Sequence, residues 1–249
     1  MTPTLVPHHP ARDWAEIQER MLVPLYEAVY DRLDVGPGCR VLGLGCGSGL
    51  ALLMAASRGA RVTGVDRDHA RVELARERMP EGAGHALVEG EPADAGDPSR
   101  TPYDLVTAFH TSTGLGRTLA AVTPLAQPGA AVVLAGWGPP ERCATSSVLR
   151  VAARLAGNRP GFGEDLEDVV ARAGLKPDGS GRVSCPFGYA DQDSAVRGLM
   201  STGDFDAAVR ATDPSQVEKE IAEALHPYVR RDGTVWMPNV FRYQIARVP

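Results

Sequence analysis

The sequence has little lysine, few cysteines and no long hydrophobic run. Lys176 and Lys219 are its two lysines, and 26 basic residues against 31 acidic ones give a formal net charge of −5. Proteins that bind nucleic acid need a basic surface to neutralise phosphates, so this balance argues against DNA or RNA as a partner. No stretch reaches the ~18 apolar residues that a membrane span requires, so we expect no membrane partner either.

The cysteines are also too scattered to indicate a disulfide framework or a metal site. They include no C-x-x-C pair, and no group of Cys and His has the spacing of zinc ligands, so we expect no metal. The first ten residues lack the apolar core of a signal peptide. These features favour a reduced, cytoplasmic protein. The four cysteines are Cys39, Cys46, Cys143 and Cys185.

Short apolar runs alternate with helical patterns over the first part of the chain. This alternation predicts an α/β fold with a mostly parallel sheet and helices on both faces. With two further strands, over 182–187 and 240–248, we predict a Rossmann-like, doubly wound sheet of seven strands. The first five predicted strands cover 40–44, 61–65, 85–89, 103–109 and 130–135.

The 249 residues suit a single domain, which we assign to 1–249. Its core is predicted at about 36–136 plus 182–187 and 240–248. The remaining segments are the N-terminal helices at 13–34, kinked or split by Pro24, and the inserted segment 139–235, which includes a long helix over 204–225. We expect these segments to form a helical roof over a substrate pocket.

A glycine cluster follows the first predicted strand and is the most informative segment. Gly45, Gly47 and Gly49 stand between that strand and a predicted helix. A strand that ends in glycines and opens a helix lets the backbone approach a ligand closely. Asp66 ends the next strand, and a carboxylate there can accept both hydroxyls of a ribose. The pair predicts a nucleoside-containing cofactor.

The dinucleotide fingerprint G-x-G-x-x-G is the obvious competitor for this loop. Counted from Gly43 its sixth position is Ser48, and counted from Gly45 it is Leu50. The spacing is G-x-G-x-G instead, which leaves less room for a pyrophosphate. An NAD-dependent oxidoreductase on the same sheet topology is therefore disfavoured.

The G-x-G-x-G spacing closely resembles motif I of the class I S-adenosylmethionine-dependent methyltransferases, and the resemblance covers about residues 38–136. In that family the glycine loop packs against the methionine part of the cofactor, and the acid ending the second strand binds its ribose. The resemblance implies S-adenosyl-L-methionine as the cofactor. The residues it assigns to binding here are Gly45, Cys46, Gly47, Ser48, Gly49, Asp66 and Arg67.

Two later segments extend the resemblance. Residues 89–94 resemble the loop that borders the adenine, with Glu91 at the usual acidic position and Pro92 after it. Phe109 ends the predicted fourth strand and His110 follows it, at the carboxyl end where α/β sheets bind ligands. The resemblance implies cofactor contacts for all four residues.

The chain departs from the family at Gly43. The family commonly carries an acidic residue there, which helps to anchor the amino group of the cofactor. We expect a backbone carbonyl, or a polar group after the fourth strand, to compensate for the missing acid.

Methyl transfer from a sulfonium is a direct displacement, so alignment can supply much of the catalysis. A general base is needed only if the acceptor must lose a proton. His110 is the candidate base, because imidazole titrates near neutral pH. The alternative, which we favour, is that His110 binds the cofactor without proton transfer. Trp14, Trp137 and His226 are candidates to line the acceptor pocket.

The predicted function is S-adenosylmethionine-dependent methylation of a small molecule, with a secondary metabolite as one candidate acceptor. One alternative keeps the fold and the cofactor but catalyses a non-methylating reaction, such as a cyclisation. Another is a binding protein without enzymatic activity. Oxygen, nitrogen and carbon acceptors are all compatible with the sequence, and so is a homodimer.

Overall fold

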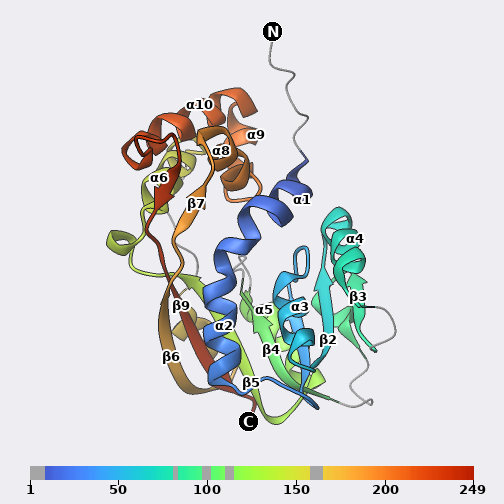
Figure 1. Ribbon diagram of the computed structural model, residues 1–249. Coiled ribbons are helices and arrows are strands. Elements are labelled where there is room, and N and C mark those ends of the chain that lie inside the picture. The colour runs from blue at the N-terminus through green and yellow to red at the C-terminus, as the bar shows by residue number, and fades with distance from the viewer. Residues whose placement is uncertain (1–8, 81–83, 97–101, 110–114, 158–164) are drawn as a thin grey trace.

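A computed structural model describes residues 9–80, 84–96, 102–109, 115–157 and 165–249. A seven-stranded sheet forms the lower part of the molecule, and helices α6 and α8 to α10 form a cap above it (Figure 1). The strand order is β3-β2-β1-β4-β5-β9-β6, and β9 runs antiparallel to both of its neighbours. The mostly parallel, Rossmann-like sheet predicted from the sequence is confirmed.

Except for β6, the sheet strands are those expected from the apolar runs, with shifted ends. The smaller strands β7 and β8 pair with each other in a separate two-stranded sheet. The strands are β1 (Arg40–Leu44), β2 (Arg61–Asp66), β3 (Ala86–Glu89), β4 (Tyr103–Ala108), β5 (Ala126–Trp137), β6 (Lys176–Ser184), β7 (Phe187–Tyr189), β8 (Val235–Met237) and β9 (Val240–Arg247).

The helices cover both faces of the sheet and build the cap. Among the described helices, none combines the length and the apolar character needed to cross a bilayer. They are α1 (Pro10–Asp13), α2 (Val23–Arg32), α3 (Leu50–Ser57), α4 (His69–Arg78), α5 (Leu115–Val122), α6 (Thr145–Leu155), α7 (Leu166–Arg172), α8 (Gln192–Met200), α9 (Asp206–Ala211) and α10 (Pro214–Leu225). Short 3₁₀ turns cover Glu19–Leu22, Pro92–Ala95, Thr123–Leu125, Pro140–Arg142 and His226–Tyr228.

The apolar residues of the central strands pack into two separate hydrophobic cores, one on each face of the sheet. Val41 and Leu105 belong to the cluster that includes residues of α2, α3 and the cap, whereas Leu42 and Val106 belong to the cluster of α5 and α7. Successive side chains of a strand point to opposite faces, so a strand buried on both sides needs apolar residues at every position. This is why β1 and β4 are largely apolar, although β4 also contains Asp104 and Thr107.

The N-terminal helix predicted over 13–34 is divided into short pieces. Between α1 and α2 the chain forms a π-helical turn, Trp14–Gln18, and then the 3₁₀ turn Glu19–Leu22. Pro24 lies in the first turn of α2, where its missing N–H removes no helical hydrogen bond. The proline therefore begins a helix instead of kinking one.

The helix predicted over 204–225 is likewise two helices, α9 and α10. Asp213 caps the second, because its side chain accepts a hydrogen bond of 3.0 Å from the backbone N–H of Gln216. Pro214 occupies the first turn of α10. An aspartate followed by proline is a helix start, so the break follows from the local sequence.

The strand predicted over 182–187 was misplaced. The observed β6 is Lys176–Ser184, whereas Phe187 belongs to β7. The glycines of β6 interrupt the apolar pattern that would have predicted this strand. The residues that pack against these positions explain why glycine is found there. A Cβ atom on Gly181 would lie 2.4 Å from the ring of Tyr243 on β9, so only glycine fits.

The part of the cap that comprises α8 to α10 leaves and rejoins the sheet at neighbouring positions of β6 and β9. Ser184 of β6 pairs with Val240 of β9, and the next residue, Cys185, donates its backbone N–H to the carbonyl of Asn239 at 2.9 Å. Gly138, which follows β5, donates to the carbonyl of Val240 at 2.7 Å. The chain therefore leaves the sheet after β6, runs through β7, α8, α9, α10 and β8, and returns to the sheet at β9, the antiparallel neighbour of β6.

We predict that Gly64→Ala destabilises the fold by about 1–3 kcal/mol through overpacking. A Cβ atom there would lie 2.5 Å from Leu52 Cδ1 and 2.8 Å from Cys46 Sγ, beneath the glycine loop. Gly116→Ala in α5 is the control, since no atom lies within 4 Å of its added Cβ. Urea unfolding measures both. A Gly64→Ala protein as stable as wild type would contradict this packing.

Candidate functional site

The parallel strands bring three predicted site segments to one edge of the sheet. β1 lies between β2 and β4, and Gly43 is in register with Gly64 on one side and Thr107 on the other. The glycine loop after β1, Asp66 at the end of β2 and the end of β4 therefore lie side by side. The crevice at this edge, where strand order reverses between β1 and β4, is where open α/β sheets bind ligands.

The glycine loop passes through the left-handed backbone region at every second residue. Gly45, Gly47 and Gly49 have φ angles of +60°, +56° and +82°. A Cβ atom on Gly49 would lie 2.9 Å from that of Ala75 on α4, so this part of the loop is packed tightly. Gly45 is exposed, and a Cβ atom added to it would have no atom within 4 Å. The loop thus has one open side, where a ligand could touch the backbone directly.

Asp66 is oriented by this loop. Its Oδ2 accepts the backbone N–H of Gly47 at 2.8 Å, and its Oδ1 accepts that of Asp68 at 2.9 Å. The side chain is half-buried, and each carboxylate oxygen can accept a further hydrogen bond. Asp66 is therefore held in place and can still accept hydrogen bonds from a ligand.

The loop after β3 lies beside the end of β2. Glu91 accepts a hydrogen bond of 2.5 Å from Arg67, and both side chains are exposed. The backbone N–H of Glu91 donates to Asp94 at 2.7 Å, which caps the short 3₁₀ turn beginning at Pro92. Two of the residues predicted to border the adenine are thus ordered by contacts of their own.

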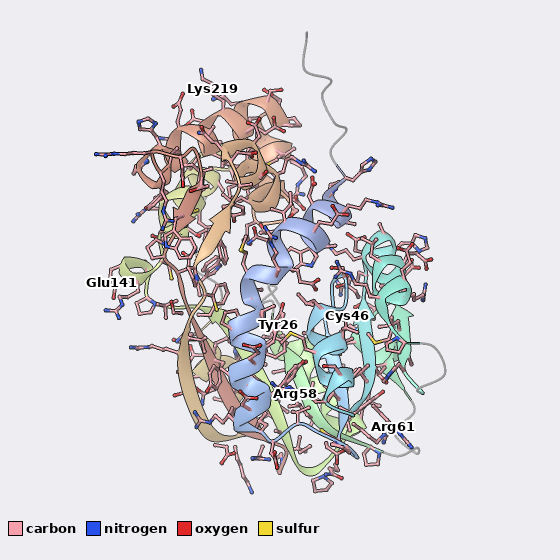
Figure 2. The ribbon with its side chains drawn as sticks, viewed as in Figure 1. Tyr26, Cys46, Arg58, Arg61, Glu141 and Lys219 are labelled. Carbon is pink, nitrogen blue, oxygen red and sulfur yellow. The ribbon has the colours of Figure 1, made fainter. Side chains whose placement is uncertain are left out.

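Cys46 packs inside the loop and does not act as a nucleophile in this environment. Figure 2 shows it next to α3, and it is buried. Burial raises the pKa of its thiol to about 12, and the nearby carboxylates Asp66 and Glu19 act in the same direction. A thiol protonated at neutral pH is a poor nucleophile, so Cys46 fills space.

Trp14 covers the glycine loop from the N-terminal segment. It is buried, and its Nε1 lies 2.8 Å from the position that a Cβ on Gly47 would take. The guanidinium of Arg71 on α4 lies over the ring, 4.8 Å from its centre. The sequence predicted Trp14 as an acceptor contact, and the structure places it against the predicted cofactor loop.

Glu19 was not predicted, yet it is bonded to the loop on several sides. Its carboxylate accepts hydrogen bonds from Ser48 Oγ at 2.5 Å, from the backbone N–H of Leu50 at 3.3 Å and from Arg78 at 2.9 Å. The residue is 1% exposed, and burial raises its pKa. Position 19 lies beside the apolar stripe of the predicted N-terminal helix, where a charged residue is ordinary, so the pattern did not indicate its role.

The same N-terminal segment is attached to the cap. Asp13, also buried, forms an ion pair with Arg197 of α8, and Gln18 accepts a hydrogen bond of 2.9 Å from Tyr189 of β7. The segment between α1 and α2 therefore contacts the cap through one set of polar side chains and the glycine loop through another. Sequence reasoning missed these pairs because their partners are more than 150 residues away in the chain.

The other predicted residues lie in three different settings. Phe109 is buried, with its ring 4.8 Å from that of Tyr26 on α2. Trp137 ends β5 in an aromatic cluster, 4.6 Å from Phe241. His226 is exposed after α10. His110 lies outside the described residues. The roles predicted for these side chains stay predictions.

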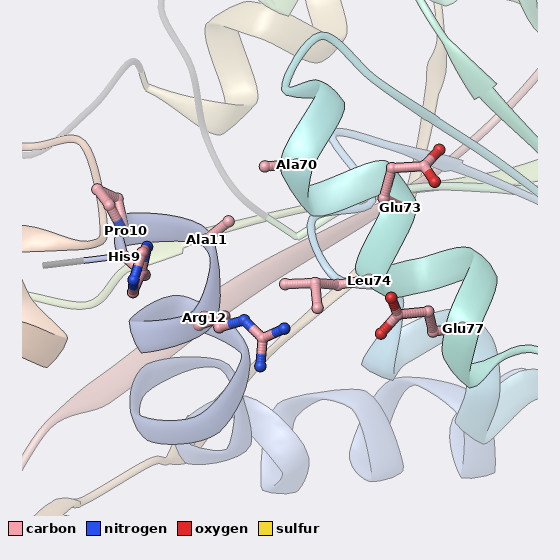
Figure 3. A pocket seen from close by; sticks show the side chains of 8 residues that line it. All are labelled: His9, Pro10, Ala11, Arg12, Ala70, Glu73, Leu74 and Glu77. Atoms are coloured by element: carbon pink, nitrogen blue, oxygen red, sulfur yellow. The ribbon is translucent and has the colours of Figure 1, made fainter. Parts of the chain in front are cut away.

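A groove of about 300 Å³ lies between α1 and α4 (Figure 3). It is lined on one side by residues 9–12, including Arg12, and on the other by Ala70, Glu73, Leu74 and Glu77. None of the residues predicted to bind the cofactor lines it. Within the described ranges, no cluster of three or more His, Cys, Asp or Glu side chains could hold a metal ion.

Comparison with known proteins supports the assignment of the loop. Residues 41–129 match a family described as a methyltransferase domain. The chain is 34% identical over 146 residues to a ribosomal protein L11 methyltransferase of Dechloromonas aromatica (strain RCB), covering 58% of this chain and 46% of that protein. It is 33% identical over 87 residues to a magnesium-protoporphyrin O-methyltransferase of Rhodobacter capsulatus, covering 33% and 38%. The chain thus spans less than half the length of these relatives.

The fold is shared more widely than the sequence. A methyltransferase from Thiobacillus denitrificans, solved in complex with S-adenosyl-L-homocysteine, matches with a TM-score of 0.53 and 21% identity, covering 97% of this chain and 94% of that one. At this identity the likeness concerns the fold. Together with the strand order, it shows that the chain has the Rossmann-like fold of this methyltransferase, and residues 41–129 match the methyltransferase-domain family that the resemblance in the sequence indicated.

Proposed function

We propose that this protein binds S-adenosyl-L-methionine and transfers its methyl group to a small molecule. One observation carries the proposal: the left-handed glycine loop, open at Gly45, lies beside the oriented carboxylate of Asp66. An open backbone turn next to a ribose acceptor is what a nucleoside cofactor with a short amino-acid arm requires. The matching domain family supports the same conclusion.

The residues at this edge fit such a cofactor. S-adenosylmethionine supplies a methyl group on a positively charged sulfur, which an acceptor can take by direct displacement. Asp66 has spare acceptor capacity for ribose hydroxyls, and Gly45 leaves the backbone accessible. Trp14 lies against the loop at Gly47, which would exclude water on that side. Gly47, Ser48 and Gly49 shape the turn, while Arg67, Glu91, Pro92, Phe109 and His110 remain proposed contacts.

The proposed acceptor is a small molecule that enters beneath the cap. The aromatic cluster of Trp137, Phe187 and Phe241 lies where β5 passes into the cap, near the carboxyl ends of the parallel strands. This supports an acceptor with apolar surface. The two relatives named above act, by their names, on a ribosomal protein and on a magnesium porphyrin, so the experiment must separate protein from small-molecule acceptors.

A second function on the same site is a non-methylating reaction that uses the bound cofactor differently. The observation that favours it is Gly43, which stands where the family commonly has an acid. A fold by itself does not fix the reaction. Release of S-adenosylhomocysteine distinguishes the two, because only methyl transfer produces it.

We predict that S-adenosylmethionine and S-adenosylhomocysteine stabilise the protein and that NAD does not. A ligand that binds only the folded state adds about 2.7 kcal/mol at one hundred times its dissociation constant. Thermal unfolding at increasing ligand concentration, with adenosine as a partial ligand for comparison, measures this. Equal stabilisation by NAD would overturn the cofactor assignment.

We further predict turnover in the presence of a suitable acceptor. The protein is incubated with methyl-labelled S-adenosylmethionine and a cell extract divided by ultrafiltration into a small-molecule and a macromolecular fraction. The expected result is S-adenosylhomocysteine formation with label in a product of the small-molecule fraction. The Asp66→Asn protein is the control for contaminating enzymes. Label confined to the macromolecular fraction would contradict a small-molecule acceptor.

Asp66→Asn is predicted to weaken S-adenosylhomocysteine binding at least tenfold. Hydrogen bonds to a charged group contribute about 1.5–3 kcal/mol each, and 1.4 kcal/mol corresponds to a factor of about ten. The matched control is Asp178→Asn, since Asp178 is an exposed aspartate that pairs with Arg247 at the far edge of the sheet. Calorimetric titration compares them. An unchanged dissociation constant in folded Asp66→Asn protein would exclude Asp66 as the ribose partner.

A further inference from the structure

The side of β1 where the resembled family carries an acid has no room for one. A Cβ atom on Gly43 would lie 2.9 Å from Leu52 Cδ2 and 3.4 Å from Leu52 Cγ. The first helix after the loop therefore fills this space with an apolar side chain. A carboxylate nevertheless reaches the glycine loop, and it comes from a different part of the chain.

We propose that Glu19 supplies, from the N-terminal segment, a carboxylate that positions the glycine loop for the cofactor. This inference rests on the proposed function, because it assigns a positioning residue to the same cofactor site. It makes the segment between α1 and α2 part of that site, although the segment lies outside the sheet and outside residues 41–129.

The contacts of Glu19 fix the loop where it turns into α3. Ser48 and Leu50 flank Gly49, the residue that caps this helix, and both donate hydrogen bonds to the Glu19 carboxylate. One carboxylate thus holds the end of the loop through a side-chain hydroxyl and a backbone N–H. Both donors move with the loop, so their positions, and those of Gly45 and Gly47 before them, depend on this anchor.

Arg78 of α4 completes the arrangement. It donates to Glu19 at 2.9 Å, to the carbonyl of Ser48 at 3.1 Å and to the carbonyl of Ala15 at 3.0 Å. The guanidinium therefore offsets the charge of Glu19 and also connects the loop with the N-terminal segment. A carboxylate held by several charge-assisted bonds has one orientation, which is what a positioning residue needs.

Stability alone does not account for this carboxylate. Burial raises the pKa of Glu19, so at neutral pH the ionised form costs free energy of folding relative to the neutral form. Exchanging Glu19 for a neutral residue leaves Arg78 without its partner, which is destabilising, so a loss of stability alone does not reveal a role in the site. A role in orienting the loop predicts in addition a loss of cofactor affinity, which an ion pair outside the loop does not share, and this difference makes the inference testable.

The test compares Glu19→Gln with Asp13→Asn. Both variants remove the charge of a buried carboxylate from the same segment, but Asp13 pairs with Arg197 of the cap and Glu19 with the loop. For each variant and for wild type, calorimetry gives the dissociation constant of S-adenosylhomocysteine, and thermal unfolding without ligand gives the stability. We expect both variants to unfold at a lower temperature than wild type, because each leaves an arginine without its partner, and we expect Glu19→Gln to weaken binding at least tenfold at a temperature where it is fully folded. Asp13→Asn should bind within twofold of wild type.

The outcomes separate this inference from the proposed function. If wild type does not bind S-adenosylhomocysteine, the proposed function fails. If wild type binds and Glu19→Gln binds equally well, the function stands and the positioning role of Glu19 is wrong. Equal losses of affinity in both variants would show that Glu19 only docks the segment, and would also overturn the inference.

Discussion

Burial of the Glu19 carboxylate is the constraint on which the arrangement of the site depends. A buried charge is tolerated only when it is paired and hydrogen-bonded, and each of its partners belongs to a different element. Ser48 and Leu50 belong to the glycine loop and α3, while Arg78 belongs to α4. To satisfy one carboxylate, the N-terminal segment, the loop and α4 must come together in one geometry. Asp13 adds the cap to this assembly through Arg197.

The succession of strands and helices along the first part of the chain could be predicted because it follows from local patterns. Apolar runs between helical segments specify parallel strands, and the glycine spacing with Asp66 located the loop at their carboxyl ends. β6 could not be found in this way, because its glycines reflect neighbours that lie far away in sequence: Gly181 accommodates Tyr243 of β9. The contacts of Glu19 and Asp13 could not be predicted for the same reason, because their partners are distant in the sequence. The pattern of an amphipathic segment does not reveal which distant residue a carboxylate in it will contact.

The division of the N-terminal segment into α, π and 3₁₀ turns has a structural purpose. In a regular α-helix, residues six apart point in directions that differ by about 120°, given 3.6 residues per turn. Asp13 and Glu19 must reach the cap and the loop respectively, and Trp14 must lie over Gly47 between them. The wider π turn changes the angles at which these side chains leave the backbone. Such turns often mark functional positions in helices.

The hydrogen-bonded junction between Cys185 and Asn239 also bears on how this protein could have diversified. Since β6 and β9 are antiparallel neighbours, a turn of two residues would be enough to connect them. The chain instead inserts β7, α8, α9, α10 and β8 at the tip of what is otherwise a hairpin. Lengthening a connection whose ends are already paired adds little loop-closure entropy. Insertions and replacements at this hairpin tip could therefore accumulate over evolutionary time, remodelling the acceptor side while the strands that carry the glycine loop keep their register.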